Sequence, residues 1–265
     1  MKKLLLAVVP VLLLALPGGA LAQRMVYTSG SIVNAASNVA GPVAPNSIVS
    51  IYGSGLSYVA RALSDEDIRA GVLPIALPAT GVTATIGRQL ARFYYVSPTQ
   101  INILVPALLI PGEYVAKVAR DANGGPEVKI TVAATAPGLF LLDADTALAT
   151  RPDGSVISRE QPAVPGEAVI LHATGLGQTV PRVSDGEIPR EARYMEAFSE
   201  FRVLLDGNEI ETSRVLYAGV APGFAGLYQV NLILPETVNE NPEIRLKIGE
   251  ALSPAGPRLP VGIQP

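Results

Sequence analysis

The chain has 265 residues, with no cysteine, no tryptophan and a single histidine. These counts exclude a disulfide framework, a cysteine-ligated zinc site, a thiol nucleophile and a metal site built from several histidines. The formal net charge is −3, and the charged residues, 16 % of the chain, form no basic block, which excludes the clustered lysines and arginines that bind nucleic acid. Hydrophobic residues make up 49 % of the sequence, too many for a disordered chain.

Residues 1–22 are expected to form a cleaved signal peptide. Two lysines precede an apolar run at residues 4–16, which is shorter than the roughly 20 residues that a membrane span requires. Ala20-Leu21-Ala22 then forms a small-x-small cleavage signal, so we expect cleavage between Ala22 and Gln23. Lys+Arg then falls from 20 to 18 against 23 Asp+Glu, giving a net charge of −5. The predicted product is exported, periplasmic or extracellular, and has no membrane span.

The rest of the chain contains an internal duplication. Residues 45–56 align with 165–176, residues 100–106 with 229–235, and residues 113–118 with 243–248. These blocks occur in the same order in both halves, which predicts two tandem domains. We expect the first repeat at 23–135, a connector with a hairpin at 136–164, and the second repeat at 165–265.

Short strands dominate the expected elements. One short helical turn is expected within residues 65–70, followed by a period-two strand at 82–86 and a hairpin turn at Gly87-Arg88. In the strand starting at residue 100, Gln100 and Asn102 share one face and the intervening isoleucines share the other. Further on, the sequence predicts turns at 153–154 and 206–208, and a second helical turn within 189–198. This pattern is typical of an all-β protein with two tandem Ig-like β-sandwich repeats.

Several motifs together resemble the uncharacterised C-terminal domain family expanded in Solibacter and related Acidobacteria. The resemblance extends from about residue 32 to residue 263 and implies export and an Ig-like, or TIG-like, β-sandwich build. It implies no activity, because none is assigned to the family. The motifs that carry it lie at residues 32–37, 44–56, 95–98, 100–102, 136–140, 173–177, 217–224 and 226–231.

Two sets of polar residues are candidate sites on strands. His172 is the one imidazole available as a general base, but its duplicated counterpart is Tyr52, which favours a packing or surface role over catalysis. The amide pairs Gln100/Asn102 and Gln229/Asn231 occur in both repeats. We interpret them as a structural repeat motif that satisfies backbone groups near irregular loops. A ligand-binding face is the alternative interpretation.

Acidic and charged loops supply the other candidates. The acids at residues 65–67 and at 143 and 145 lack the regular spacing of a calcium loop, so no cofactor is expected, with calcium as an alternative. Two equivalent but divergent segments, 57–80 and 177–200, follow the Gly-Leu blocks of the repeats. Loops on a rigid scaffold often carry binding residues. The second segment therefore provides the predicted ligand-contact loop, with Arg190, Arg193 and Tyr194.

Three classes of function are compatible with these features. The leading hypothesis is an exported, non-enzymatic β-sandwich module that contacts an envelope or extracellular protein. The alternative is a carbohydrate-binding module whose partner is a polysaccharide, although aromatic residues are only 5 % of the chain. A hydrolase is the distant alternative, because a carboxylate pair for glycoside hydrolysis can assemble from any part of a fold.

Overall fold

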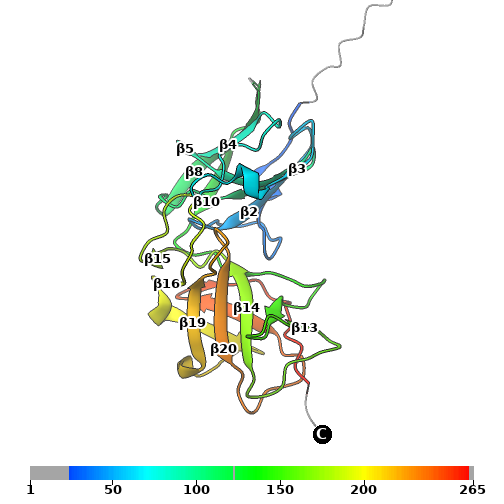
Figure 1. The fold of residues 1–265 in the computed structure, drawn as a ribbon, viewed down its shortest axis with the longest axis vertical. Helices are drawn as coiled ribbons and strands as arrows, with labels where there is room; N and C mark the ends of the chain where they lie inside the picture. Colours follow the sequence, from blue (N-terminus) through cyan, green and yellow to red (C-terminus); the bar gives the residue numbers. More distant parts are fainter. Residues whose placement is uncertain (1–23, 122, 263–265) are drawn as a thin grey trace, which may run out of the picture.

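The computed structural model describes residues 24–121 and 123–262, which form two β-sandwiches stacked along the long axis of the molecule (Figure 1). The predicted leader, with Ala22 and Gln23, lies outside the described residues. No helix in the described ranges is long and apolar enough to cross a membrane. The helical segments there are short 3₁₀ turns: η1 (Ser29–Ser31), η2 (Asp65–Asp67), η3 (Phe198–Glu200) and η4 (Thr212–Arg214).

The first sandwich consists of two antiparallel sheets. One has the order β1 (Ile32–Asn34), β2 (Ile48–Tyr52), β7 (Gln100–Leu104), β6 (Arg92–Val96) and β3 (Arg61–Ala62). The other has the order β10 (Val128–Val132), β8 (Gly112–Arg120), β4 (Val82–Ile86) and β5 (Gln89–Leu90), with β9 (Asn123–Gly124) paired to β8.

The second sandwich repeats this plan with a wider first sheet. That sheet has the order β13 (Val156–Ile157), β12 (Ala149–Thr150), β14 (Ala168–Thr174), β20 (Tyr228–Ile233), β19 (Val215–Val220), β16 (Arg193–Met195) and β15 (Thr179–Val180), and β11 (Gly138–Leu139) also pairs with β14. The facing sheet has the order β18 (Asn208–Glu209), β17 (Phe201–Leu205), β21 (Ile244–Ile248) and β22 (Ala251–Leu252).

The duplication is visible in the strand order. β2, β7 and β6 occupy the same relative places as β14, β20 and β19. Even a local irregularity repeats, because the register shifts between Phe93 and Tyr95 on β6 and between Val215 and Tyr217 on β19. The predicted fold class, an all-β sandwich, is confirmed.

The alternation of the central strands separates core from surface. Ile101 and Ile103 are buried in the first core, whereas Gln100 and Asn102 on the same strand are only half-buried. The apolar side chains therefore fill the space between the sheets, and the amides lie on the outer face.

Two expectations for local structure need correction. The segment expected to be a connector contributes β11, β12 and β13 to the second sandwich, with the predicted turn at residues 153–154 joining β12 to β13. The helical turn predicted within 189–198 is instead β16, since tertiary pairing with β19 overrides the weak local signal. The other helical turn is present as η2, and the turns at Gly87 and Gly207 join their hairpins as predicted.

A third apolar cluster joins the two sandwiches. Leu104 from the end of β7 packs with Leu73 and Ala225, which come from a loop of the first repeat and a loop of the second. Partly buried Tyr94 packs against this cluster, and its hydroxyl donates to the carbonyl of Ala225. Because burying apolar surface is favourable, the cluster favours one fixed arrangement of the repeats.

A buried hydroxyl links the strand ends at this junction. Thr174 at the end of β14 is fully buried, and its Oγ1 accepts from the backbone N–H of Ile48 at 2.9 Å. The same hydroxyl donates to the carbonyl of Gly226 at 2.7 Å. β14 therefore ends where β2 begins. The sheet that contains β2 and the sheet that contains β14 thus meet end to end at these two strands.

The two divergent loop segments also meet at the junction. The backbone N–H of Leu73 donates to the carbonyl of Gly186 at 2.9 Å, and that of Ile188 donates to the carbonyl of Gly71 at 2.8 Å. Between these bonds Asp185 bridges the repeats, because its carboxylate accepts from Arg92 Nε at 3.0 Å and from the backbone N–H of Ala107 at 3.1 Å. These contacts hold the orientation of the repeats.

The Thr174 hydroxyl predicts a specific loss of stability. Thr174→Val keeps the shape of the side chain but leaves the N–H of Ile48 and the carbonyl of Gly226 without that partner in a buried site. We expect the free energy of unfolding to fall by about 1–3 kcal/mol, measured by urea denaturation. The matched control is Thr131→Val on the exposed side of β10, expected to change stability by less than about 0.5 kcal/mol. Equal effects of the two substitutions would contradict the role of Thr174.

Candidate functional site

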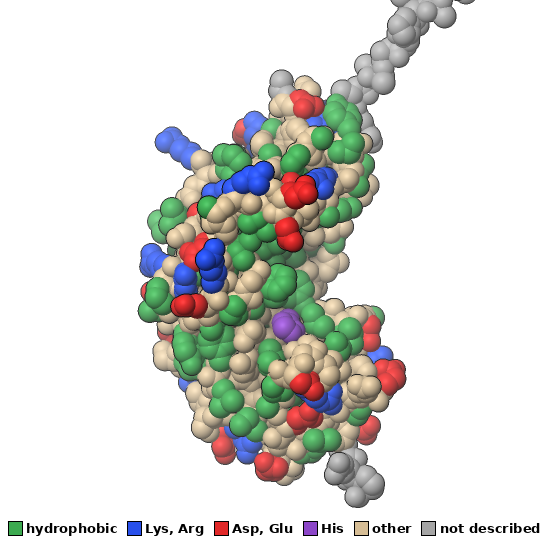
Figure 2. Space-filling view, in the orientation of Figure 1, with side chains coloured by type: hydrophobic (Ala, Val, Ile, Leu, Met, Phe, Trp, Pro, Cys, Tyr) green, Lys and Arg blue, Asp and Glu red, His purple; other side chains and the backbone are tan. Residues whose placement is uncertain are grey.

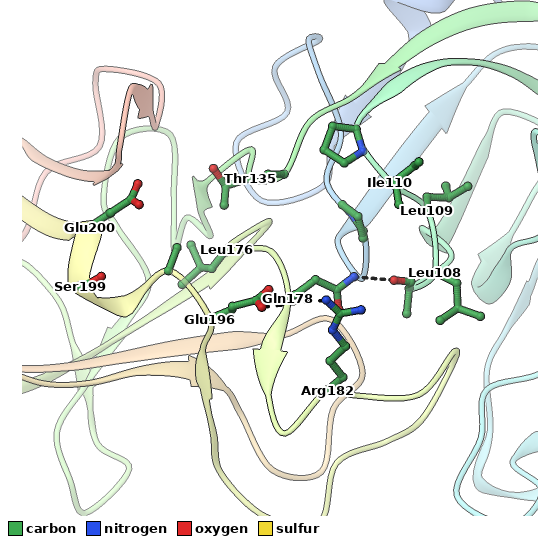
Figure 3. A pocket seen from close by; sticks show the side chains of 15 residues that line it. Leu108, Leu109, Ile110, Thr135, Leu176, Gln178, Arg182, Glu196, Ser199 and Glu200 are labelled. Atoms are coloured by element: carbon green, nitrogen blue, oxygen red, sulfur yellow. Dashed lines mark hydrogen bonds and ion pairs between the residues drawn. The ribbon is translucent and has the colours of Figure 1, made fainter.

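A cleft opens beside the junction, with a volume of about 490 Å³. One wall comes from the first repeat and contains the aliphatic side chains of Leu108 and Ile110, and the opposite wall comes from the second repeat and contains Glu196 and Glu200 (Figure 3). Gln178 reaches across and donates from Nε2 to the carbonyl of Ala107 at 2.6 Å. The cleft is therefore built from both repeats and depends on their relative position.

The segment predicted to carry ligand contacts, residues 177–200, supplies the second-repeat wall of this cleft, but its three named residues do not line it. Arg193 is held internally, because its guanidinium forms an ion pair with Glu187 at 2.6 Å. Arg190 is exposed and has no ion-pair partner among the described residues. Tyr194, 48 % exposed, projects from β16 beside β19. Of the three, Arg193 has a structural contact and Tyr194 lies on the outer face of a sheet.

In the described structure, the two amides of each pair hydrogen-bond to one another rather than to backbone groups. Gln100 Nε2 donates to Asn102 Oδ1 at 2.9 Å, and Gln229 Nε2 donates to Asn231 Oδ1 at 3.2 Å. We expected these amides to hydrogen-bond to backbone groups of neighbouring loops, but their hydrogen bonds in the structure join side chains. Their half-exposed position leaves hydrogen-bonding capacity toward solvent, including the Oε1 atom of Gln229.

The strand register aligns a row of side chains across the second sheet. His172 lies opposite Gln229, Gln229 lies opposite Gly219, and Gly219 lies opposite Tyr194. On the other side of β14, the backbone N–H of Phe140 donates to the carbonyl of His172 at 2.9 Å. Opposed residues of an antiparallel ladder share a face, and strands are spaced about 4.8 Å apart. We call this set the outer row; its members are Phe140, His172, Gln229, Gly219 and Tyr194.

An aromatic cluster closes one end of the outer row. Tyr194 contacts Tyr217 edge-to-face, with ring centroids 4.9 Å apart, and Phe198 with centroids 5.3 Å apart. The hydroxyl of Tyr217 lies over Gly219, where an added Cβ would come within 2.5 Å of it. Gly219 is therefore required for the close approach of the Tyr217 ring. Burial raises the pKa of Tyr217 to about 12, so its hydroxyl stays protonated and donates to the carbonyl of Arg193.

His172 lies between Phe140 and Gln229 in the row, in the hollow between the repeats where Figure 2 shows the purple imidazole. Its Nε2 is 3.3 Å from Thr150 Oγ1. Burial lowers the pKa of His172, because desolvation disfavours the charged ring. No carboxylate belongs to the row, so the imidazole has no acid to orient it as a catalytic base there. The packing or surface role expected for His172 fits this environment.

The first repeat has rings beside its amide pair on the central strands but none on the edge strand β3. Tyr52 lies opposite Gln100, and Tyr95 lies opposite Asn102. The neighbouring edge strands contribute no further aromatic side chain there, since β3 places Ala62 opposite Tyr95. A row that ends in Phe140 on one side and Tyr194 on the other is therefore a feature of the second repeat.

Arginines pair with three of the acids considered for calcium, Asp67, Asp143 and Asp145. Arg61 Nη2 contacts both carboxylate oxygens of Asp67, at 3.1 and 3.0 Å. Arg159 Nη2 donates to Oδ1 of Asp145 and lies 3.8 Å from Oδ1 of Asp143. Within residues 24–121 and 123–262, no group of three or more histidine or acidic side chains is arranged to hold a metal ion.

The sequence did not predict how the residues of the outer row come together, nor did it predict the first-repeat wall of the cleft. Phe140 lies in a segment interpreted as a connector, and Leu108 and Ile110 follow a strand as ordinary apolar residues. The alternation around Gln229 was the available signal for the outer row, but its partners come from strands far apart in the chain. Only the register of β14, β20, β19 and β16 brings them together.

No protein-family model and no curated protein matches the chain. Among solved structures, it is similar to the surface glycan-binding protein SGBP-B of the Bacteroides ovatus mixed-linkage glucan utilization locus, with 10 % identity, a TM-score of 0.33, and coverage of 84 % of this chain and 44 % of that chain. The surface glycan-binding protein PbSGBP-B of Prevotella bryantii gives 10 % identity, a TM-score of 0.28, and coverage of 89 % and 42 %.

Domains 5–6 of the S-layer protein SbsC give 10 % identity, a TM-score of 0.27, and coverage of 91 % of this chain and 100 % of that chain. The chain thus spans less than half the length of the two glycan-binding proteins. Similarities at these TM-scores do not define a ligand for this chain.

The burial of His172 predicts a pH-dependent stability. Its pKa is lowered in the folded chain, so near and below the unfolded value of about 6.5 the unfolded chain binds more protons. Burial of the neutral imidazole therefore costs no stability through protonation above about pH 6.5. As the pH falls from about 6.5 toward the lower pKa of the folded chain, the free energy of unfolding decreases. We expect wild type to lose more thermal stability than His172→Gln between about pH 7.5 and pH 5. Equal losses in the two proteins would contradict this.

Proposed function

We propose that this protein is an exported, non-catalytic module that binds a neutral polysaccharide along the outer row. The observation that carries the proposal is the alignment of rings and hydrogen-bonding side chains in one line across β14, β20, β19 and β16, with Phe140 bonded to β14 at one end. Four strand spacings of about 4.8 Å give the row a length of about 19 Å, enough for several sugar units.

The chemistry of the row suits a sugar chain. Sugar rings have apolar C–H faces edged by hydroxyls, so they pack on aromatic faces and bond to neighbouring amides. Tyr194 and Phe140 supply rings at the two ends, and His172 and Gln229 supply donors and acceptors between them. The row contains no charged group, which favours a neutral glycan over an acidic one.

The proposal of a non-catalytic module follows from the same residues. Glycoside hydrolysis uses two carboxyl groups on either side of the scissile bond. The outer row has none, and its neighbouring Asn231 and Tyr217 add only an amide and a protonated hydroxyl. A ligand on this face is therefore held without being cleaved.

Export supports a polysaccharide ligand. The predicted signal peptide and the resemblance to the Solibacter domain family both favour a protein outside the cytoplasm. Such a location gives access to envelope and environmental polysaccharides. We propose the periplasm or the cell exterior as the site of action.

The outer row predicts which substitutions weaken binding. Affinity gel electrophoresis against soluble polysaccharides, including mixed-linkage glucan and xyloglucan, is expected to retard the wild-type protein in at least one gel. Tyr194→Ala removes a ring and is expected to weaken that affinity about ten-fold, and Gln229→Ala about three- to ten-fold. The measurement is the dissociation constant obtained from mobility against polysaccharide concentration.

The matched control is Tyr58→Ala, which removes a tyrosine that is 56 % exposed and stacks on Arg120 in the first repeat. It is expected to leave the affinity unchanged. Thermal unfolding of each variant shows whether its fold is intact, since Tyr194 also packs on Tyr217. Failure of every polysaccharide to retard the protein, or equal effects of Tyr194→Ala and Tyr58→Ala, would overturn the proposal.

A further inference from the structure

The cleft beside the junction has a chemistry that the outer row does not share. Its first-repeat wall carries Leu108 and Ile110, which are 68 % and 70 % exposed and are the most exposed large hydrophobic side chains of the described chain. Exposed apolar side chains gathered in a concave site commonly mark an interaction surface. Among the described residues that line the cleft none is aromatic, so this lining lacks the rings on which a sugar packs.

The second-repeat wall is acidic. Glu200 has no ion-pair partner in the described part of the chain, and Glu196 has only a 3.9 Å contact with Arg182. Both members of that pair are mostly exposed, so the contact contributes little and leaves the carboxylate available. Two carboxylates against one guanidinium make this wall attractive to a cation.

We propose that the cleft binds an extended peptide segment of a partner protein in which aliphatic and basic residues alternate. Successive side chains of an extended peptide point in opposite directions. A leucine or similar residue then packs on Leu108 and Ile110 while the next residue, lysine or arginine, faces Glu196 and Glu200. Figure 3 shows the two kinds of side chain on opposite sides of the cleft, as this alternation requires.

The apolar wall is held in place before a ligand arrives. Ala107, which precedes Leu108, donates its backbone N–H to Asp185 and accepts from Gln178 with its carbonyl. Both partners belong to the second repeat, so the loop cannot move away without breaking contacts across the junction. A preformed wall reduces the ordering cost of binding.

The test uses fluorescence anisotropy with three short, capped, fluorescein-labelled peptides. In the first, leucine and lysine alternate; in the second, leucine and glutamate alternate; in the third, the leucines and lysines of the first are separated into two blocks. The first is expected to bind, with affinity that falls as salt rises, and the other two to bind at least about ten-fold more weakly.

Two double variants test the two walls separately. Leu108→Ser with Ile110→Ser is expected to weaken binding of the first peptide at least about ten-fold. Glu196→Gln with Glu200→Gln is expected to weaken it about three- to ten-fold and to remove most of the salt dependence. The matched controls are Leu90→Ser and Glu211→Gln, exposed residues away from the cleft that should leave binding unchanged.

Three results would overturn the proposal: no binding of the first peptide, equal binding of the lysine and glutamate peptides, or equal effects of the cleft and control variants. Thermal unfolding of every variant excludes a general loss of fold as the cause. None of the substituted residues belongs to the outer row. Loss of peptide binding and loss of polysaccharide binding are therefore separate outcomes.

Discussion

The arrangement of the whole molecule depends on the buried junction between its two repeats. There the Thr174 hydroxyl joins the start of β2 to the loop before β20, and Asn46 Nδ2 lies 3.4 Å from the hydroxyl of Tyr228. Separating the repeats would expose the apolar cluster around Leu104 and leave these polar groups to find new partners. Because buried polar groups are costly without hydrogen bonds, the junction favours a single rigid body. The cleft exists only because its two walls are fixed in this way.

The alternation of apolar and polar residues within single strands predicted the fold class of this chain. It did not predict which residues come together on the surface of the folded protein. Alternation around Gln100 and Gln229 predicted which side chains face outward, since period two is a property of a single strand. The partners of those amides depend on pairing register, which is set by contacts between strands distant in sequence. The bulge before Tyr217 illustrates this limit, because it moves that ring over Gly219 and no local sequence signal for it was recognised. The general position of the outer face was therefore predictable, and its aromatic end was not.

The charged loop of the second repeat was only partly interpretable from its composition. Arg190, Arg193 and Tyr194 were predicted as ligand contacts, but several charged residues of this loop bond within the protein. Asp185 holds the first repeat, and Arg193 is held by Glu187. A sequence gives no measure of which charges will pair with each other, since pairing requires the folded positions of both partners. The carboxylates without a close partner, such as Glu200, become identifiable only after the paired ones have been assigned.

Duplication followed by divergence explains how one fold presents two different surfaces. Both repeats keep the amide pair, and β3 pairs with β6 in the first sheet as β16 pairs with β19 in the second. The difference lies in the side chains, because Tyr194 on β16 and Phe140 just after β11 bring rings to the edges of the outer row, whereas β3 carries Ala62. The first repeat instead contributes the loop with Leu108, which becomes a wall when the acidic loop of the other repeat lies opposite. One surface is aromatic and uncharged, and the other is aliphatic and acidic, so the ligands proposed for them differ in kind. Because both surfaces belong to one rigid body, the polysaccharide and the protein partner proposed as their ligands would be held at a fixed separation.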